Sequence, residues 1–155
     1  MNQNGYGVIS SRKRLKGRTS KANNYYSVTL CCYGRQPIFK NFSNGIIAAK
    51  ALYNLKEKVD TICFVLMPDH LHWIFRLHPR QSLSHVIKHY KSEVTICIRK
   101  KIGRKVVIWQ SNYYDHMIRD ENDLINQARY IVANPLRANL VKSVGDYSFW
   151  NCIWL

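Results

Sequence analysis

The sequence predicts an α+β fold: a ferredoxin-like, split βαβ sandwich with an antiparallel sheet and an extra C-terminal helix. Three observations indicate this class. Segments with strand and helix character follow the order β-α-β-β-α-β-α. The second and third strands are separated only by a turn at Pro68, as in an antiparallel hairpin. The 155 residues are enough for one domain and too few for two ordinary ones.

The elements of the first half are predicted from residue type and spacing. Residues 25–33 are rich in β-branched and aromatic side chains and precede a glycine and a proline, which predicts a strand. Apolar residues then recur at helical spacing over 46–58, which predicts a helix. Two further apolar runs, 61–67 and 70–77, form the strands of the hairpin.

The second half is predicted to contain two helices around another extended region. Apolar positions at helical spacing favour a helix over 82–101, ended by a nearby glycine. Residues 106–109 and 113–118 together predict the fourth extended region. A last helix is expected over 120–134, capped by its aspartate and stopped by the proline that follows.

The charge of the chain favours a nucleic-acid partner. There are 24 Lys and Arg against 9 Asp and Glu, a formal net charge of +15. Basic side chains in such excess bind nucleic acid favourably because they neutralise its phosphates and release counterions. A merely basic protein, or one that touches anionic lipid, is the alternative. Residues 1–23 are expected to form a flexible basic arm that contacts DNA, before a catalytic domain over 24–155. The basic residues of the arm are Arg12, Lys13, Arg14, Lys16, Arg18 and Lys21.

Cysteine usage and hydropathy favour a cytoplasmic protein without a membrane segment. The five cysteines are odd in number and show no Cys-x-x-Cys pair, so free thiols in a reducing compartment are expected. The central apolar stretch 62–67 is far shorter than the ~20 residues that span a bilayer. The first residues lack the charged start and apolar run of a secretory signal.

The segment 67–73, Met-Pro-Asp-His-Leu-His-Trp, is a candidate metal site. Side chains two apart on a strand point to the same side about 7 Å apart, so His70 and His72 can converge on one ion. Leu71 points to the opposite face. Two ordinary half-buried histidines are the alternative. Residue 74 is Ile, which argues against a histidine-triad nucleotide hydrolase.

A second candidate lies on the predicted last helix. Tyr130 and Asn134 are four residues apart, so the two side chains share one helix face. A phenol and an amide oxygen are thus presented together. The alternative is a structural tyrosine followed by an asparagine at the end of a helix.

Together the two segments resemble the REP-associated tyrosine transposases, members of the single-tyrosine, His-hydrophobic-His superfamily. That family carries proline-aspartate-His-hydrophobic-His on a strand and tyrosine-x-x-x-asparagine on a later helix. The resemblance spans roughly 25–155. It continues in Trp109-Gln110, Tyr114-Asp115-His116, Ile118-Arg119 and residues 128–140.

The resemblance implies that His70 and His72 bind Mg²⁺ or Mn²⁺, that Tyr130 is the nucleophile and that Asn134 is a third protein ligand. Related transposases commonly have the longer glutamine in place of Asn134. A phenol with a pKa of ~10 is a poor nucleophile at neutral pH, and a divalent ion assists by neutralising and orienting the phosphate.

The implied activity is a single-stranded DNA endonuclease and strand-transferase that forms a 5′-phosphotyrosine at imperfect REP-type hairpins. The resemblance further implies a monomer or weak homodimer in the bacterial cytoplasm, associated with the nucleoid. A non-catalytic nucleic-acid-binding module on the same fold is the alternative function.

Other residues have weaker claims. Tyr113 and Tyr114 are rival nucleophiles, but neighbours on a strand face opposite sides and at most one can reach the site. His116 and Asp115 could assist near the site or form a structural pair. Surface or helix-packing roles are expected for His78, His85 and His89.

Overall fold

A five-stranded antiparallel sheet is the middle layer of the computed structural model, which describes residues 20–154. The strand order is β4-β1-β3-β2-β5, so β3 is inserted between β1 and β2 as a split βαβ unit requires. The predicted antiparallel α+β fold is therefore confirmed. The strands are β1 (Tyr25–Cys31), β2 (Val59–Met67), β3 (His70–Leu77), β4 (Tyr114–Met117) and β5 (Trp150–Cys152).

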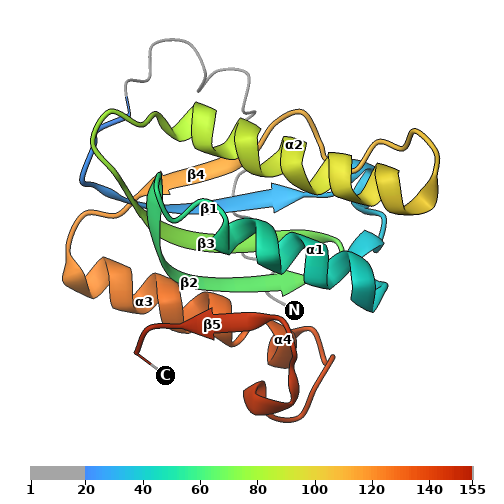
Figure 1. Cartoon of the computed structure of the whole chain (residues 1–155). Helices are drawn as coiled ribbons and strands as arrows, with labels where there is room; N and C mark the ends of the chain where they lie inside the picture. The colour runs from blue at the N-terminus through green and yellow to red at the C-terminus, as the bar shows by residue number, and fades with distance from the viewer. Residues whose placement is uncertain (1–19, 155) are drawn as a thin grey trace.

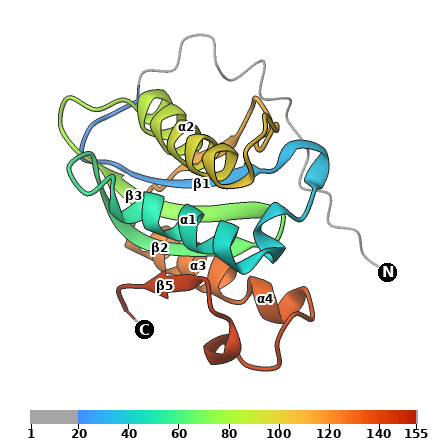
Figure 2. The same cartoon turned by 45° about the vertical axis from the view of Figure 1, so that its right-hand side comes forward.

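Helices cover both faces of this sheet (Figures 1 and 2). α1 (Phe42–Tyr53) and α2 (Leu83–Ile102) lie on one face, and α3 (Glu121–Val132) packs on the other against β2 and β5. β2 is almost entirely buried because it is covered from both sides. The sheet thus separates two apolar cores.

The side chains of β3 alternate between these two cores. Trp73 and Phe75 lie in the larger core, beneath α1 and α2. Ile74 lies in the smaller core, beneath α3. Because alternate residues of a strand share a face, His70 and His72 lie on the α3 side with Ile74. The fold therefore brings the predicted metal motif to the face that α3 covers.

The structure differs from the prediction at two places near the sheet edges. The segment 106–109 is not a strand, and Trp109 makes only an isolated bridge with Cys32. β5, which the sequence pattern did not predict, pairs antiparallel with β2. The apolar C-terminal segment packs back on the domain through Trp150, whereas Trp154 is half exposed.

Capping residues set most of the helix boundaries. α1 begins four residues before the predicted start because the Asn41 side chain accepts a hydrogen bond from Asn44 N at 3.2 Å. α2 agrees with the prediction, with Ser82 as N-cap and Gly103 in the left-handed region at its end. Asp120 caps α3 as expected: its side chain accepts a hydrogen bond from Asp123 N, in the first turn of the helix, at 2.9 Å.

The single helix predicted over 120–134 is wrong, because the structure has two. α3 ends at Val132, Ala133 is its C-cap, and Asn134 begins the short α4 (Asn134–Arg137). Pro135 lies in the first turn of α4, where its missing N–H breaks no helical hydrogen bond. The proline therefore starts a second helix, and Tyr130 and Asn134 belong to consecutive helices.

The predicted basic arm lies mostly outside the described residues, which begin at residue 20. Of its basic side chains, only that of Lys21 is described. The chain just before β1 is tied to the domain: Ser20 Oγ accepts from Leu83 N at 3.1 Å, and Asn23 N donates to Leu77 O at 2.7 Å.

The five cysteines are free thiols, as the sequence predicts. Three of them, Cys32, Cys63 and Cys152, are buried like small apolar side chains. Within residues 20–154, no helix combines the length and apolar character needed to cross a bilayer.

The C-terminal segment is fastened to the sheet and to α1. Tyr147 donates its hydroxyl proton to Leu66 O at 2.7 Å, and Leu66 N donates to Phe149 O at 2.8 Å. Phe149 then lies directly against Gly45 of α1, where a Cβ atom would stand 2.5 Å from Cζ of the ring. The absence of a side chain at Gly45 therefore creates the space for this ring.

Gly45→Ala should destabilise the protein, although alanine favours a helix over glycine by about 1 kcal/mol. The new methyl group would overpack against Phe149, which typically costs about 1–3 kcal/mol, so we expect a net loss of about 1 kcal/mol. Urea denaturation checks this. In the Phe149→Leu background the same substitution should be neutral or stabilising; stabilisation by Gly45→Ala in the wild-type background would contradict the packing account.

Candidate active site

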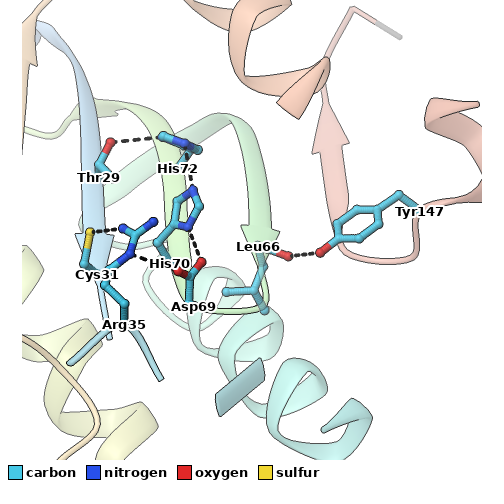
Figure 3. Close-up of polar contacts among 8 residues, drawn as sticks. All are labelled: Thr29, Cys31, Arg35, Leu66, Asp69, His70, His72 and Tyr147. Atoms are coloured by element: carbon cyan, nitrogen blue, oxygen red, sulfur yellow. Dashed lines mark hydrogen bonds and ion pairs between the residues drawn. The ribbon is translucent and has the colours of Figure 1, made fainter. Parts of the chain in front are cut away.

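The two histidines of β3 converge through their Nε2 atoms. The distance from His70 Nε2 to His72 Nε2 is 3.1 Å, and the rings are nearly perpendicular at 88°. Figure 3 shows the two imidazoles side by side at the end of the hairpin. Without a cation, two facing ring nitrogens can be joined by one shared proton at most. The geometry is therefore that of two ligands directed at one point.

Each histidine is oriented by a partner on its other nitrogen (Figure 3). Asp69 Oδ1 lies 2.6 Å from His70 Nδ1, and Thr29 Oγ1 lies 3.0 Å from His72 Nδ1. The carboxylate is an acceptor, so Nδ1 of His70 donates the proton and Nε2 keeps its lone pair. A carboxylate or hydroxyl behind the ring is the usual support of a metal-binding histidine.

Burial keeps both imidazoles neutral. Desolvation lowers the pKa of His72 to about 3, with further lowering by His70 and by the positive charges of Arg137 and Arg35. Desolvation also lowers the pKa of His70, although Asp69 acts in the opposite direction. A neutral imidazole is the form that ligates metal ions. The pair is therefore in its ligand form at neutral pH.

The distance between the two Nε2 atoms suits two adjacent ligands of an octahedral metal ion. Adjacent ligands at about 2.1 Å from such an ion lie about 3.0 Å from each other, close to the 3.1 Å between the two Nε2 atoms. Within residues 20–154, no group of three or more His, Cys, Asp or Glu side chains could hold an ion.

Tyr130 lies on the helix that covers this face of the sheet. α3 packs through Leu124, Ala128 and Ile131, whereas Tyr130 stands beside this apolar row with its side chain 48% exposed. The phenol is thus on the correct side of the sheet and accessible to a large substrate.

Arg137 of α4 connects the two residues of the predicted tyrosine-asparagine motif. Its guanidinium carbon lies 3.9 Å from the centre of the Tyr130 ring, and its Nη1 donates to Tyr130 O at 2.8 Å. Its Nη2 donates to Asn134 Oδ1. The charge of Arg137 also lowers the pKa of His72. The described residues show no direct contact of Tyr130 or Asn134 with the histidines.

The rival residues have other environments. Tyr114 pairs with Thr29, and Thr29 pairs with His72, so the tyrosine lies in the same cross-strand row on the histidine face. Tyr113 packs against the larger core. His116 binds Asp123 at 2.9 Å and so links β4 to the start of α3, while Asp115 lies on the opposite face of β4.

The remaining histidines are distant from this arrangement, as expected. His78 binds Asp60 at 2.8 Å, and His85 and His89 are exposed on α2.

Sequence reasoning missed three residues of the site: Thr29, Arg35 and Arg137. Arg35 Nε lies 2.9 Å from Asp69 Oδ2, and its Nη1 donates to Cys31 Sγ at 3.0 Å. Thr29 is 43 positions from His72 and leaves no local signal. Arg137 leaves no local signal either, because it lies on a separate helix from Tyr130 and contacts its ring only through the turn at Ala133.

Comparison with known proteins relates the chain to transposases. Residues 14–134 match the family model described as transposase IS200 like. An uncharacterized protein of Haemophilus influenzae is 26% identical, covering 79% of this chain and 86% of its own. The REP-associated tyrosine transposase of Escherichia coli is 31% identical, covering 56% of this chain and 50% of its own. This chain therefore matches only half of the E. coli protein.

A solved structure of a REP-associated tyrosine transposase bound to a REP hairpin has the same fold. Its TM-score with this chain is 0.70 at 22% identity, and the match covers 86% of this chain and 79% of that one.

The lowered pKa of His72 should make the stability of the metal-free protein depend on pH. An unfolded histidine has a pKa of ~6.5, whereas folded His72 has a pKa of about 3. Between these values the unfolded state binds more protons, so the free energy of unfolding falls as the pH falls. From pH 7 to pH 5, this group should remove about 2 kcal/mol of stability.

Urea denaturation at both pH values, in the presence of EDTA, measures this loss. His72→Gln has no imidazole to titrate and should lose about 2 kcal/mol less over the same interval. Equal pH dependence in the variant and the wild type would show that His72 takes a proton readily in the folded state.

Proposed function

This chain belongs to the transposase IS200-like family, and on that premise we propose that it is a metal-dependent single-stranded DNA endonuclease and strand-transferase with Tyr130 as its nucleophile. The observation that carries the proposal is the histidine pair: two half-buried, neutral imidazoles with their Nε2 atoms 3.1 Å apart and an orienting partner on each Nδ1. Convergence of two Nε2 atoms, with a partner behind each ring, is the arrangement expected of two imidazole ligands of one ion.

His70 and His72 would hold a Mg²⁺ or Mn²⁺ ion, and Asn134 would supply a further ligand. An amide oxygen has two lone pairs, so Asn134 Oδ1 can ligate an ion while it accepts its hydrogen bond from Arg137. When bound, the ion would neutralise charge on a non-bridging phosphate oxygen. Oxygen-preferring ions of this kind also suit the phosphate itself.

Tyr130 would attack the phosphorus of the DNA backbone in line with the leaving 3′ oxygen. A bond forms from the phenol oxygen to phosphorus, and the bond from phosphorus to the 3′ oxygen breaks. The phenol loses its proton and the 3′ oxygen gains one, leaving a 5′-phosphotyrosine and a free 3′-hydroxyl. Attack by a 3′-hydroxyl reverses the step, so strand transfer needs no nucleotide cofactor.

Single-stranded DNA with imperfect hairpins of the REP type is the proposed substrate. The formal net charge of +15 supports a polyanionic partner. The similarity in fold to a transposase bound to a REP hairpin supports the hairpin form of that partner. The site would act on the flexible strand beside the hairpin, where a phosphate can reach the sheet face.

Thr29→Val should weaken Mn²⁺ binding about tenfold or more, because it removes the hydroxyl that orients His72. Isothermal titration calorimetry measures the affinity. Thr95→Val is the matched control, since the hydroxyl of Thr95 bonds only within α2, to Lys91 O at 2.7 Å. An unchanged affinity in Thr29→Val, or an equal loss in both variants, would mean that this hydroxyl does not support a metal ligand.

Tyr130→Phe should form no covalent adduct with a labelled single-stranded hairpin in the presence of Mn²⁺, yet should bind that hairpin with wild-type affinity. The exposed ring remains, and only the phenol oxygen is lost. Denaturing gels before and after protease treatment detect the adduct. Tyr114→Phe is the control, because Tyr114 shares the histidine face and should not be required. An adduct formed by Tyr130→Phe would disprove the assigned nucleophile.

A further inference from the structure

Two guanidinium groups from separate parts of the chain contact residues of the proposed site. Arg35 closes the 3-10 turn Tyr33–Arg35 after β1, and Arg137 is the last residue of α4. Both are exposed, the Arg35 side chain to 52%. Arg35 Nε lies 2.9 Å from Asp69 Oδ2, the carboxylate that also bonds His70, and Arg137 contacts Tyr130 and Asn134. Two exposed cations therefore contact residues of the proposed catalytic centre.

Arg35 is held in place by its backbone and by one side of its guanidinium. Its φ of 55° is left-handed, an unusual conformation for arginine, and Arg35 N donates to Cys32 O at 3.0 Å. Cys32 N in turn donates to Asp69 O at 2.8 Å, which fixes the turn against the hairpin. The Nε–H of the side chain is bonded to Asp69, and one Nη1–H is donated to Cys31 Sγ. Within residues 20–154, three of its five N–H donors have no protein partner and can bind a ligand.

Arg137 has only neutral partners among the contacts that the structure gives it. These are the ring and carbonyl oxygen of Tyr130 and the amide oxygen of Asn134. Asp69 is the carboxylate at the pair, and Arg35 and His70 already share it. Arg137 is thus a cation with no carboxylate among its contacts in the described residues, and its guanidinium can bind the negative charge of a phosphodiester.

We propose that Arg35 and Arg137 bind the phosphodiester of the DNA strand at the histidine pair, donating to its non-bridging oxygens. The assignment rests on the proposed function and adds the residues that hold the substrate. A guanidinium presents parallel N–H donors that match phosphate oxygens and stays charged at any physiological pH. Arg137, stacked on Tyr130, would also set the distance between the bound phosphate and the phenol.

The first test measures the rate of adduct formation in a single turnover at saturating Mn²⁺. Arg35→Gln and Arg137→Gln should each slow the reaction about tenfold or more, with hairpin affinity and the Mn²⁺ concentration for half-maximal rate within about threefold of wild type. Arg80→Gln is the matched control: Arg80 is exposed, has a left-handed φ of 63° and lies in the β3–α2 loop. Its loss should leave the rate within about twofold.

Two results would overturn the proposal. Unchanged rates would show that the arginines do not touch the reacting phosphate. Recovery of the wild-type rate at higher Mn²⁺ would show that they act only by positioning Asp69 and Asn134.

A second test does not depend on cleavage. The Arg35 Nε–H is bonded to Asp69, so its NMR resonance is observable and can be assigned with Arg35→Lys. Addition of an eight-nucleotide thymidine oligomer should shift this resonance and that of Arg137, and the neutral methylphosphonate analogue should not. If wild type forms no adduct but these shifts occur, the proposed function fails and the phosphate site stands. If neither oligomer, or both equally, shifts the resonances, the phosphate site fails.

Discussion

The alternation of side chains along β3 is the constraint on which the site depends. β3 lies between β1 and β2 in the sheet, so a shift by one residue would move Trp73 and Phe75 out of the larger core. The same shift would place His70 and His72 in the larger core, where Trp73 and Phe75 now pack. The core would lose apolar contact area, and the two imidazoles would lose their hydration. The larger core thus decides that the histidines face α3.

Residues of the neighbouring strand and of the adjoining turn then orient the two histidines. The register pairs Thr29 with His72, and the tight β2–β3 turn sets Asp69 beside His70. With each Nδ1 engaged, both Nε2 atoms face one shared point, and desolvation keeps both imidazoles uncharged. α3 packs its apolar side on the same face and carries Tyr130 at the margin of that contact. The proposed transesterification requires these parts together.

The sequence predicted the elements whose bounds depend on side-chain alternation and on helix capping. The bounds of β3 were predicted to the residue because its alternation is strong on both faces, and α2 carries clear caps at both ends. β5 was missed because three residues hold too little pattern. Pro135 was taken as a stop although proline is tolerated in a first helical turn. Thr29 and Arg35 join the site only through strand pairing and turn geometry, which local spacing does not reveal.

The central claim is that Tyr130 attacks a DNA phosphate beside the histidine pair. The most direct measurement is mass spectrometry of the covalent adduct trapped from wild-type protein, Mn²⁺ and a single-stranded hairpin, after protease and nuclease digestion. The account predicts a nucleotide attached through its 5′ phosphate to the peptide that contains Tyr130. A nucleotide on the peptide of any other residue, Tyr114 above all, would contradict it.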